Sequence, residues 1–281
     1  MHLVPGSASS TRWIRAALAA TGLVIGLAGC VTSGGPAPRP YRATGDDDLK
    51  TASDQTNADR LYNTRMELAQ AYFGRNQPTD ALDQVKQALQ AKPDMSAAYG
   101  LRGLIYASLG DNEKSEESFH RAMQLAPHDA DLIHNYGWSL CQQRRFDEAD
   151  AAFRRAIAEP GYRSISRTML VEGVCQARAG KPQDAERTLA RAYELDPANP
   201  TIAVNLAEVL YRSGQYERAR FYIRRVNTRQ ELASAQTLWL AARIEHKLGQ
   251  EEQVKGMGAQ LHNRFPDSPE TALYEKGKFD E

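Results

Sequence analysis

A repeat of about 34 residues, which begins near residue 62, constrains the fold of this chain more than any other feature. Pro93 and Pro127 lie 34 residues apart, and Pro197 and Pro266 each follow about two periods further on. One column of small residues returns in every copy: Ala69, Gly103, Gly137, Gly173, Ala207 and Ala242. Self-similarity at a fixed period of this length is typical of a solenoid, in which each copy packs on its neighbours.

Each copy contains two segments with the apolar periodicity of a helix, joined by a short turn such as Leu109-Gly110-Asp111. The small-residue column allows the first helix to approach the second, whose bulky residues, Phe119 and Phe153 among them, fill the remaining space. Prolines such as Pro93 stop the second helix and turn the chain into the next copy. The sequence therefore predicts an all-α chain of stacked helix pairs.

This pattern resembles the tetratricopeptide repeat (TPR), which implies a right-handed superhelical solenoid. Six copies can be drawn: 62–95, 96–129, 130–163, 166–199, 200–233 and 235–268. The sixth copy departs from the pattern at Glu245, Val254 and Gly258, so we expect it to be distorted. Residues 269–281 predict a short capping segment, with Ser268 as the N-cap, because a solenoid must cover its last apolar face.

The beginning of the chain has the layout of a bacterial lipoprotein signal. Arg12 and Arg15 precede an apolar stretch that ends at Leu27 and is too short for a spanning helix. The sequence Leu27-Ala28-Gly29-Cys30 resembles a lipobox, which implies that residues 1–29 are removed and that Cys30 is acylated. An ordinary secretory signal is the alternative. Because Val31 stands where an Asp would resemble the inner-membrane retention signal, we expect a lipid anchor in the outer membrane, on its periplasmic face.

The charge composition argues against one class of function, nucleic-acid binding. The 35 basic and 35 acidic residues cancel, and removal of residues 1–29 leaves 33 basic residues against 35 acidic ones. Nucleic-acid binding requires a basic face, so we expect no nucleic-acid partner. Residues 30–61 are rich in Gly, Pro, Ser, Thr and Asp and predict a flexible linker behind the lipidated cysteine.

Two cysteines remain besides Cys30, namely Cys141 and Cys175, and they lie 34 residues apart. Their positions within the repeat differ by two, so the sequence favours two buried free thiols over a structural disulfide. Neither CxxC spacing nor clustered His and Cys residues indicate a metal or redox site.

The resemblance to TPR proteins also implies a concave groove, lined by the first helix of each copy. The partner-binding residues carried over from it are Met66, Phe73, Leu104, Trp138, Leu170, Val174, Tyr211 and Trp239. Arg243 and Lys247 fall on groove positions as well. A contiguous apolar patch of this kind usually marks a partner site. The alternative is that neighbouring first helices simply bury one another's side chains.

Some TPR grooves hold a peptide's carboxylate through paired Lys, Arg and Asn residues. Asn135 and Asn205 match such a clamp, but Gly100 and Leu104 stand where its other members belong. We therefore expect the ligand to be an apolar or amphipathic protein segment.

The sequence contains no motif for nucleotide, metalloprotease or serine-hydrolase chemistry, and we expect no catalysis, no cofactor and no small-molecule substrate. The lipobox, the six repeats and the ending around Arg264–Glu270 together resemble the family of type IV pilus biogenesis and stability proteins, the pilotins PilF and PilW. That resemblance implies binding of pilus secretin subunits, their localisation to the outer membrane and their multimerisation. Two alternatives remain: another TPR lipoprotein of the envelope, such as a β-barrel assembly factor or a regulator of peptidoglycan synthesis, and a hydrolase on a TPR scaffold.

Overall fold

A computed structural model describes residues 55–280, and these form helix pairs throughout. The first helices of the pairs are α1 (Asn57–Gly74), α3 (Ser96–Ser108), α5 (Ala130–Gln142), α7 (Ile165–Arg178), α9 (Pro200–Arg212) and α11 (Ala235–Lys247). The second helices are α2 (Pro78–Ala91), α4 (Asn112–Leu125), α6 (Phe146–Ala158), α8 (Pro182–Leu195), α10 (Tyr216–Asn227) and α12 (Glu251–Arg264), and α13 (Pro269–Glu275) follows. The predicted all-α solenoid is confirmed. The predicted signal and the lipidation of Cys30 lie outside the described residues.

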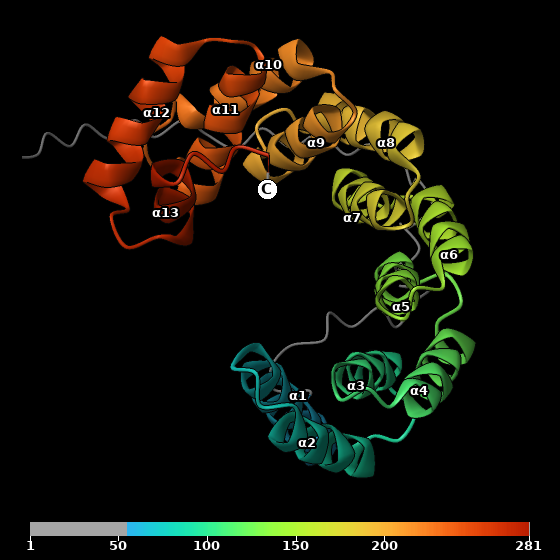
Figure 1. Cartoon of the computed structure of the whole chain (residues 1–281). Helices are drawn as coiled ribbons and strands as arrows, with labels where there is room; N and C mark the ends of the chain where they lie inside the picture. The colour runs from blue at the N-terminus through green and yellow to red at the C-terminus, as the bar shows by residue number, and fades with distance from the viewer. Residues whose placement is uncertain (1–54, 281) are drawn as a thin grey trace, which may run out of the picture. The chain divides into compact units, whose positions relative to one another are not determined.

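The contacts between pairs are asymmetric. Each first helix packs on its own partner, on the preceding second helix and on the neighbouring first helices, as α3, α5 and α7 do. Within residues 55–280 the backbones of successive second helices stand further apart, and these helices meet through long side chains, as Tyr193 on α8 and Tyr222 on α10 do. Successive pairs therefore converge on the side of the first helices, and α3, α5, α7 and α9 line the inner side of the curve that this unit follows (Figure 1).

The small-residue column explains how tightly the two helices of a pair approach. A Cβ atom added to Gly103 would lie 2.7 Å from the ring of Phe119, and one added to Gly137 would lie 2.9 Å from Phe153. Both phenylalanines are fully buried. The bulky residue of the second helix thus occupies the space that the first helix leaves free, as the sequence pattern predicts.

The turn within each pair requires a left-handed backbone at one position. Four glycines supply it with φ near +70°: Gly110, Gly180, Gly214 and Gly249. In the first and third pairs the same position is taken by Asn76 (φ 59°) and Arg144 (φ 63°). A residue that carries a Cβ atom adopts this left-handed backbone conformation at a cost of about 1 kcal/mol or more. The backbone at Arg144 is therefore strained.

Helix α1 begins before the first repeat, within residues 57–61, which we expected to belong to the linker. Thr56 accepts a hydrogen bond from the Asp59 amide at 3.1 Å, and the Asp59 carboxylate bonds back to the Thr56 amide at 3.0 Å. This reciprocal cap stabilises a helix start. Lys92 adds an ion pair to Asp59 at 2.5 Å, and its hydrogen bond, with those of Thr56, lowers the pKa of that carboxyl.

Both helices of the sixth pair are continuous, so its unusual residues interrupt neither α11 nor α12. Gly258 leaves room for the ring of Tyr274, because a Cβ atom there would lie 1.9 Å from it. Glu245 is 2% exposed and accepts hydrogen bonds from Arg224 at 2.7 and 3.1 Å. Two of the three departures from the pattern, Glu245 and Gly258, are therefore each matched by a specific neighbour.

The short helix α13 packs on α11 and α12. Ser268 caps it by accepting from the Thr271 amide at 3.2 Å, as the sequence predicts, and Gly277 (φ 64°) follows its end. Among residues 55–280, each helix is too short or too polar to cross a bilayer.

Candidate partner-binding surface

The concave side of the solenoid carries five of the predicted groove residues in a half-buried state. They are Phe73 on α1, Leu104 on α3, Trp138 on α5, and Leu170 and Val174 on α7. All five keep part of the side chain accessible, and four of them also pack against core clusters, namely Phe73, Leu104, Trp138 and Leu170. These helices therefore offer apolar surface to a partner without exposing whole side chains.

The other three predicted groove residues are buried. Met66 is 8% exposed and belongs to the core of the first pair. Tyr211 and Trp239 are 7% and 6% exposed, and both lie beneath residues that follow α13. Their role in partner binding stays a prediction, and a partner would reach Tyr211 and Trp239 only after a local rearrangement.

Helix α7 presents one stripe toward the groove, made of Leu170, Val174 and Arg178, because residues four apart share a helix face. The Arg178 guanidinium lies 5.5 Å from the centre of the Trp138 ring and donates a hydrogen bond to Gln142 at 2.9 Å. This arrangement links α7 to α5 across the groove floor. A cleft of about 240 Å³ continues beside Val174 and Arg178 toward Asn205 on α9.

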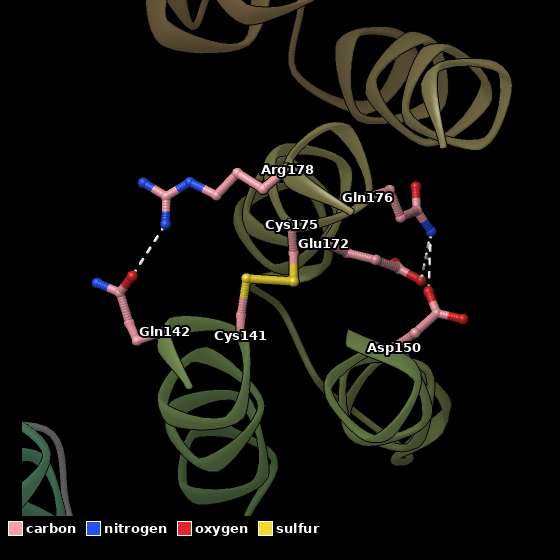
Figure 2. Close-up of a disulfide and its surroundings, with 7 residues drawn as sticks. All are labelled: Cys141, Gln142, Asp150, Glu172, Cys175, Gln176 and Arg178. Atoms are coloured by element: carbon pink, nitrogen blue, oxygen red, sulfur yellow. Dashed lines mark hydrogen bonds between the residues drawn. A yellow bond between two sulfur atoms is a disulfide. The ribbon is translucent and has the colours of Figure 1, made fainter. Parts of the chain in front are cut away.

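Cys141 and Cys175 form a disulfide between α5 and α7, so the expectation of two free thiols is wrong (Figure 2). Their Cα atoms lie 5.9 Å apart. The offset of two repeat positions corresponds to only about 3 Å along a helix axis, which the packing of two neighbouring helices accommodates. The bond therefore joins the first helices of the third and fourth pairs, within the core cluster against which Trp138 packs.

Two carboxyl groups, the buried Glu172 and the half-buried Asp150, lie on the side of α7 that faces α6 (Figure 2). Glu172 is 5% exposed, and the Gln176 amide donates to the Asp150 carboxylate at 2.9 Å and to Glu172 at 3.5 Å. Burial, with a smaller contribution from the hydrogen bond and charge of Asp150, raises the pKa of Glu172 to about 8. Glu172 consequently holds a proton at neutral pH.

His134, which falls on a groove position in the sequence, is 4% exposed and is not part of the accessible surface. A hydrogen bond of 2.9 Å joins its Nδ1 to Thr168 on α7. Burial, followed by the charge of Arg167, lowers the pKa of His134 to about 4 and leaves the ring neutral. His134 thus acts as a further link between α5 and α7.

The sequence-based reasoning missed the segment that follows α13. Phe279 packs against Trp239 and His246, and its carbonyl oxygen accepts hydrogen bonds from Arg243 and Tyr211. The single cue in the sequence is one large apolar residue within a polar stretch. No repeat position predicts where such a residue will pack.

Models of the tetratricopeptide repeat match residues 66–130, 137–200 and 176–238. The chain is 25% identical over 265 residues to the type IV pilus assembly protein PilF of Pseudomonas aeruginosa. This alignment covers 94% of the chain and 99% of that protein. The crystal structure of PilW, a type IV pilus biogenesis factor, is 31% identical, with a TM-score of 0.68 over 76% of this chain and 98% of PilW. The chain belongs to the PilF/PilW family of type IV pilus biogenesis proteins. The structure of Pseudomonas aeruginosa PilF shares the fold, with a TM-score of 0.64 at 21% identity over 79% of this chain and 100% of that one.

In this PilF/PilW family member, residues 55–280 contain no group of three or more His, Cys, Asp and Glu side chains placed to hold a metal ion. Two buried groups with shifted pKa values, Glu172 and His134, bond to different partners, Gln176 and Thr168. What the concave surface offers chemically is apolar contact, a few cationic side chains and aromatic rings, which is the chemistry of protein binding.

Proposed function

We propose that the protein is a lipid-anchored scaffold on the periplasmic face of the outer membrane, which binds secretin subunits of the type IV pilus and promotes their localisation and multimerisation. The observation that carries this proposal is a half-buried apolar surface on the concave face of a PilF/PilW-type solenoid. The protein acts by binding alone and catalyses no reaction.

The anchor is assigned to Cys30, on the strength of the preceding Leu27-Ala28-Gly29 sequence. Stable attachment requires at least two acyl chains, which the lipoprotein modification provides. Anchoring also raises the effective concentration of the groove near the membrane without any new contact. The disulfide between Cys141 and Cys175 supports a location outside the cytoplasm, because such bonds persist in oxidising compartments.

The contacts with secretin are assigned to five groove residues, namely Phe73, Leu104, Trp138, Leu170 and Val174. Aromatic residues in partly desolvated positions tend to dominate binding energy, and Trp is enriched among them. Trp138 already has one cationic neighbour, Arg178, so an amphipathic segment with an acidic edge would match both the ring and the charge.

The test is affinity capture of secretin by the purified mature protein, comparing wild type with Trp138→Ala and Phe73→Ala. We expect each substitution to reduce secretin recovery at least about tenfold, equivalent to about 1.4 kcal/mol of binding free energy. Phe221→Ala serves as the matched control, because Phe221 on α10 is an aromatic residue that is 55% exposed on a second helix. Equal recovery with all three variants would reject the groove assignment.

Deletion of the gene tests the partner itself. Loss of secretin multimers with normal levels of other outer-membrane β-barrel proteins supports the proposal. A general fall of β-barrel proteins would instead identify a β-barrel assembly factor, and unchanged secretin with altered cell-wall composition would identify a regulator of peptidoglycan synthesis.

A further inference from the structure

The segment after α13 turns back onto the concave face of the last two pairs. Gly277 adopts a left-handed backbone (φ 64°), and the Lys278 amide donates to the Leu273 carbonyl at 3.1 Å. These two features reverse the chain direction. Phe279 and Asp280 are thereby placed against α9 and α11.

The Phe279 ring is enclosed by aromatic side chains on three sides. It stacks on the His246 imidazole, with centres 4.3 Å apart and planes 20° apart. The Trp239 ring lies 5.2 Å away, and Tyr274 approaches edge-on at 6.0 Å. Phe279 also forms part of the wall of a cavity of about 650 Å³ beside α12.

The main chain and the following carboxylate are held as well. The Phe279 carbonyl accepts hydrogen bonds from Arg243 Nε at 3.2 Å and from the Tyr211 hydroxyl at 3.4 Å. Arg243 in turn lies 4.5 Å from the centre of the Tyr211 ring, which fixes its direction. Asp280 forms an ion pair with Lys247.

The residues that contact Phe279 and Asp280 form one continuous stripe. Trp239, Arg243 and Lys247 are four residues apart on α11 and therefore share a face, and Tyr211 on α9 lies beside it. They bind an aromatic side chain, a backbone carbonyl and a carboxylate, in that order along the helix. A backbone carbonyl and two adjacent side chains are features that any polypeptide can present, so these contacts do not require the segment to belong to the same chain.

We propose that Tyr211, Trp239, Arg243, His246 and Lys247 form a peptide-binding site for a partner segment in which an aromatic residue precedes an acidic one, and that Phe279 and Asp280 occupy this site until such a segment replaces them. The proposal does not depend on the identity of the partner bound by the groove of α1–α7. It assigns a second, chemically distinct site to the same concave face.

The attached segment competes strongly because it is tethered. A short tether gives an effective concentration on the order of millimolar, so a free peptide binds wild type only when its own affinity and concentration overcome that competition. The segment is held through a few side chains at the edge of the solenoid. Local opening of such a region costs less free energy than global unfolding, which makes exchange feasible.

The experiment uses the mature chain with the double substitution Phe279→Ala/Asp280→Ala, beside wild type. The probe is a fluorescently labelled peptide with the sequence of residues 276–280, Lys-Gly-Lys-Phe-Asp, blocked at both ends. Fluorescence anisotropy should show at least tenfold tighter binding to the double variant than to wild type. Replacing the Phe of the peptide by Ala, or adding Arg243→Ala to the double variant, should weaken that binding at least tenfold.

Asp280→Lys provides a second variant that keeps Phe279 in the sequence and replaces the ion pair with Lys247 by repulsion between two cations, so it disturbs the fold less than loss of the aromatic ring. It should bind the probe more tightly than wild type and less tightly than the double variant. Phe221→Ala, on α10, should leave binding unchanged. Equal affinity of wild type and both tail variants, or no saturable binding to a double variant whose circular dichroism is native, would overturn the proposal.

Discussion

The fourth and sixth pairs use the same repeat positions in opposite ways. In the fourth pair Leu170, Val174 and Arg178 remain partly accessible, whereas in the sixth pair the corresponding Trp239, Arg243 and Lys247 are contacted by the chain's own Phe279 and Asp280. The repeat position determines that a side chain faces the groove. Whether it is available to a partner depends on what lies over it, which the repeat does not encode.

The two regions are also held together differently. The middle region, residues 130–199, contains the disulfide and two buried ionisable groups, Glu172 and His134. The final region, residues 200–280, relies on apolar packing of α13 and Phe279 and on the ion pair of the buried Glu245 with Arg224. Redox state and pH should therefore act mainly on the middle region.

Removing the disulfide should have the largest effect. Replacing Cys141 and Cys175 by Ser releases a loop with a sequence separation of 34 residues, which chain entropy converts to about 3–4 kcal/mol of unfolding free energy. Urea unfolding of the double variant measures the loss, and wild type in reducing buffer should reproduce it. The loss should concentrate in the middle region, since repeat proteins couple mainly through nearest neighbours.

Single-tryptophan variants sharpen that expectation. In the mature chain, Trp239→Phe leaves Trp138 as the reporter of the middle region, and Trp138→Phe leaves Trp239 as the reporter of the final region. Without the disulfide, the unfolding midpoint at Trp138 should fall further than the midpoint at Trp239. Identical shifts would mean that both regions unfold as one unit, and the contrast between them would disappear.

Glu172→Gln should produce the next largest effect, and its sign depends on pH. The folded state raises the pKa of Glu172 from 4.5 to about 8, so its contribution to stability is complete below pH 4.5 and is lost as the pH rises to about 8. The loss amounts to at most about 1.4 kcal/mol for each pH unit. Glutamine keeps the hydrogen bonds without the charge, so the variant should be more stable than wild type at pH 8.

His134 has the opposite slope, because its pKa is lowered from 6.5 to about 4 and its contribution is lost as the pH falls through that range. The two groups should nearly cancel between pH 4.5 and 6.5 in wild type, and Glu172→Gln should reveal the histidine alone. Calorimetry at a series of pH values measures both slopes. Glu245→Gln is the control in the final region: it weakens the pair with Arg224 and should lower stability at pH 7 and 8. A stability loss for Glu172→Gln at pH 8 would contradict the assignment.

Much of the fold is predictable from the sequence because each repeat position reports a local contact. Gly103 against Phe119 and Gly137 against Phe153 are contacts between the two helices of one pair, so period and residue size suffice to infer them. The disulfide is harder to predict from the sequence, because it joins two different helix pairs. Its geometry depends on how neighbouring first helices cross, which a comparison of repeat positions does not contain.

The candidate site divides in the same way. The direction of Trp138 and Val174 follows from the repeat, whereas the burial of Met66 and Trp239 depends on packing that the repeat does not specify. Phe279 lies outside the repeat altogether. A large apolar residue in a polar stretch signals that it packs somewhere, and only the three-dimensional path of the chain after Gly277 shows where.

Arg144→Gly should have the smallest effect and should be stabilising. Arg144 (φ 63°) closes the turn of the third pair, next to the disulfide, whereas Gly214 (φ 73°) closes the equivalent turn of the fifth pair. Glycine removes the strain of the left-handed backbone but also increases the conformational entropy of the unfolded chain. The net gain in unfolding free energy should therefore be about 0.5–1 kcal/mol. The reciprocal change, Gly214→Ala, should cost about 1 kcal/mol or more. Urea midpoints of the two variants, read at Trp138 and Trp239, should move in opposite directions. A midpoint that falls for Arg144→Gly would show that the arginine contributes more through its side chain than its backbone costs.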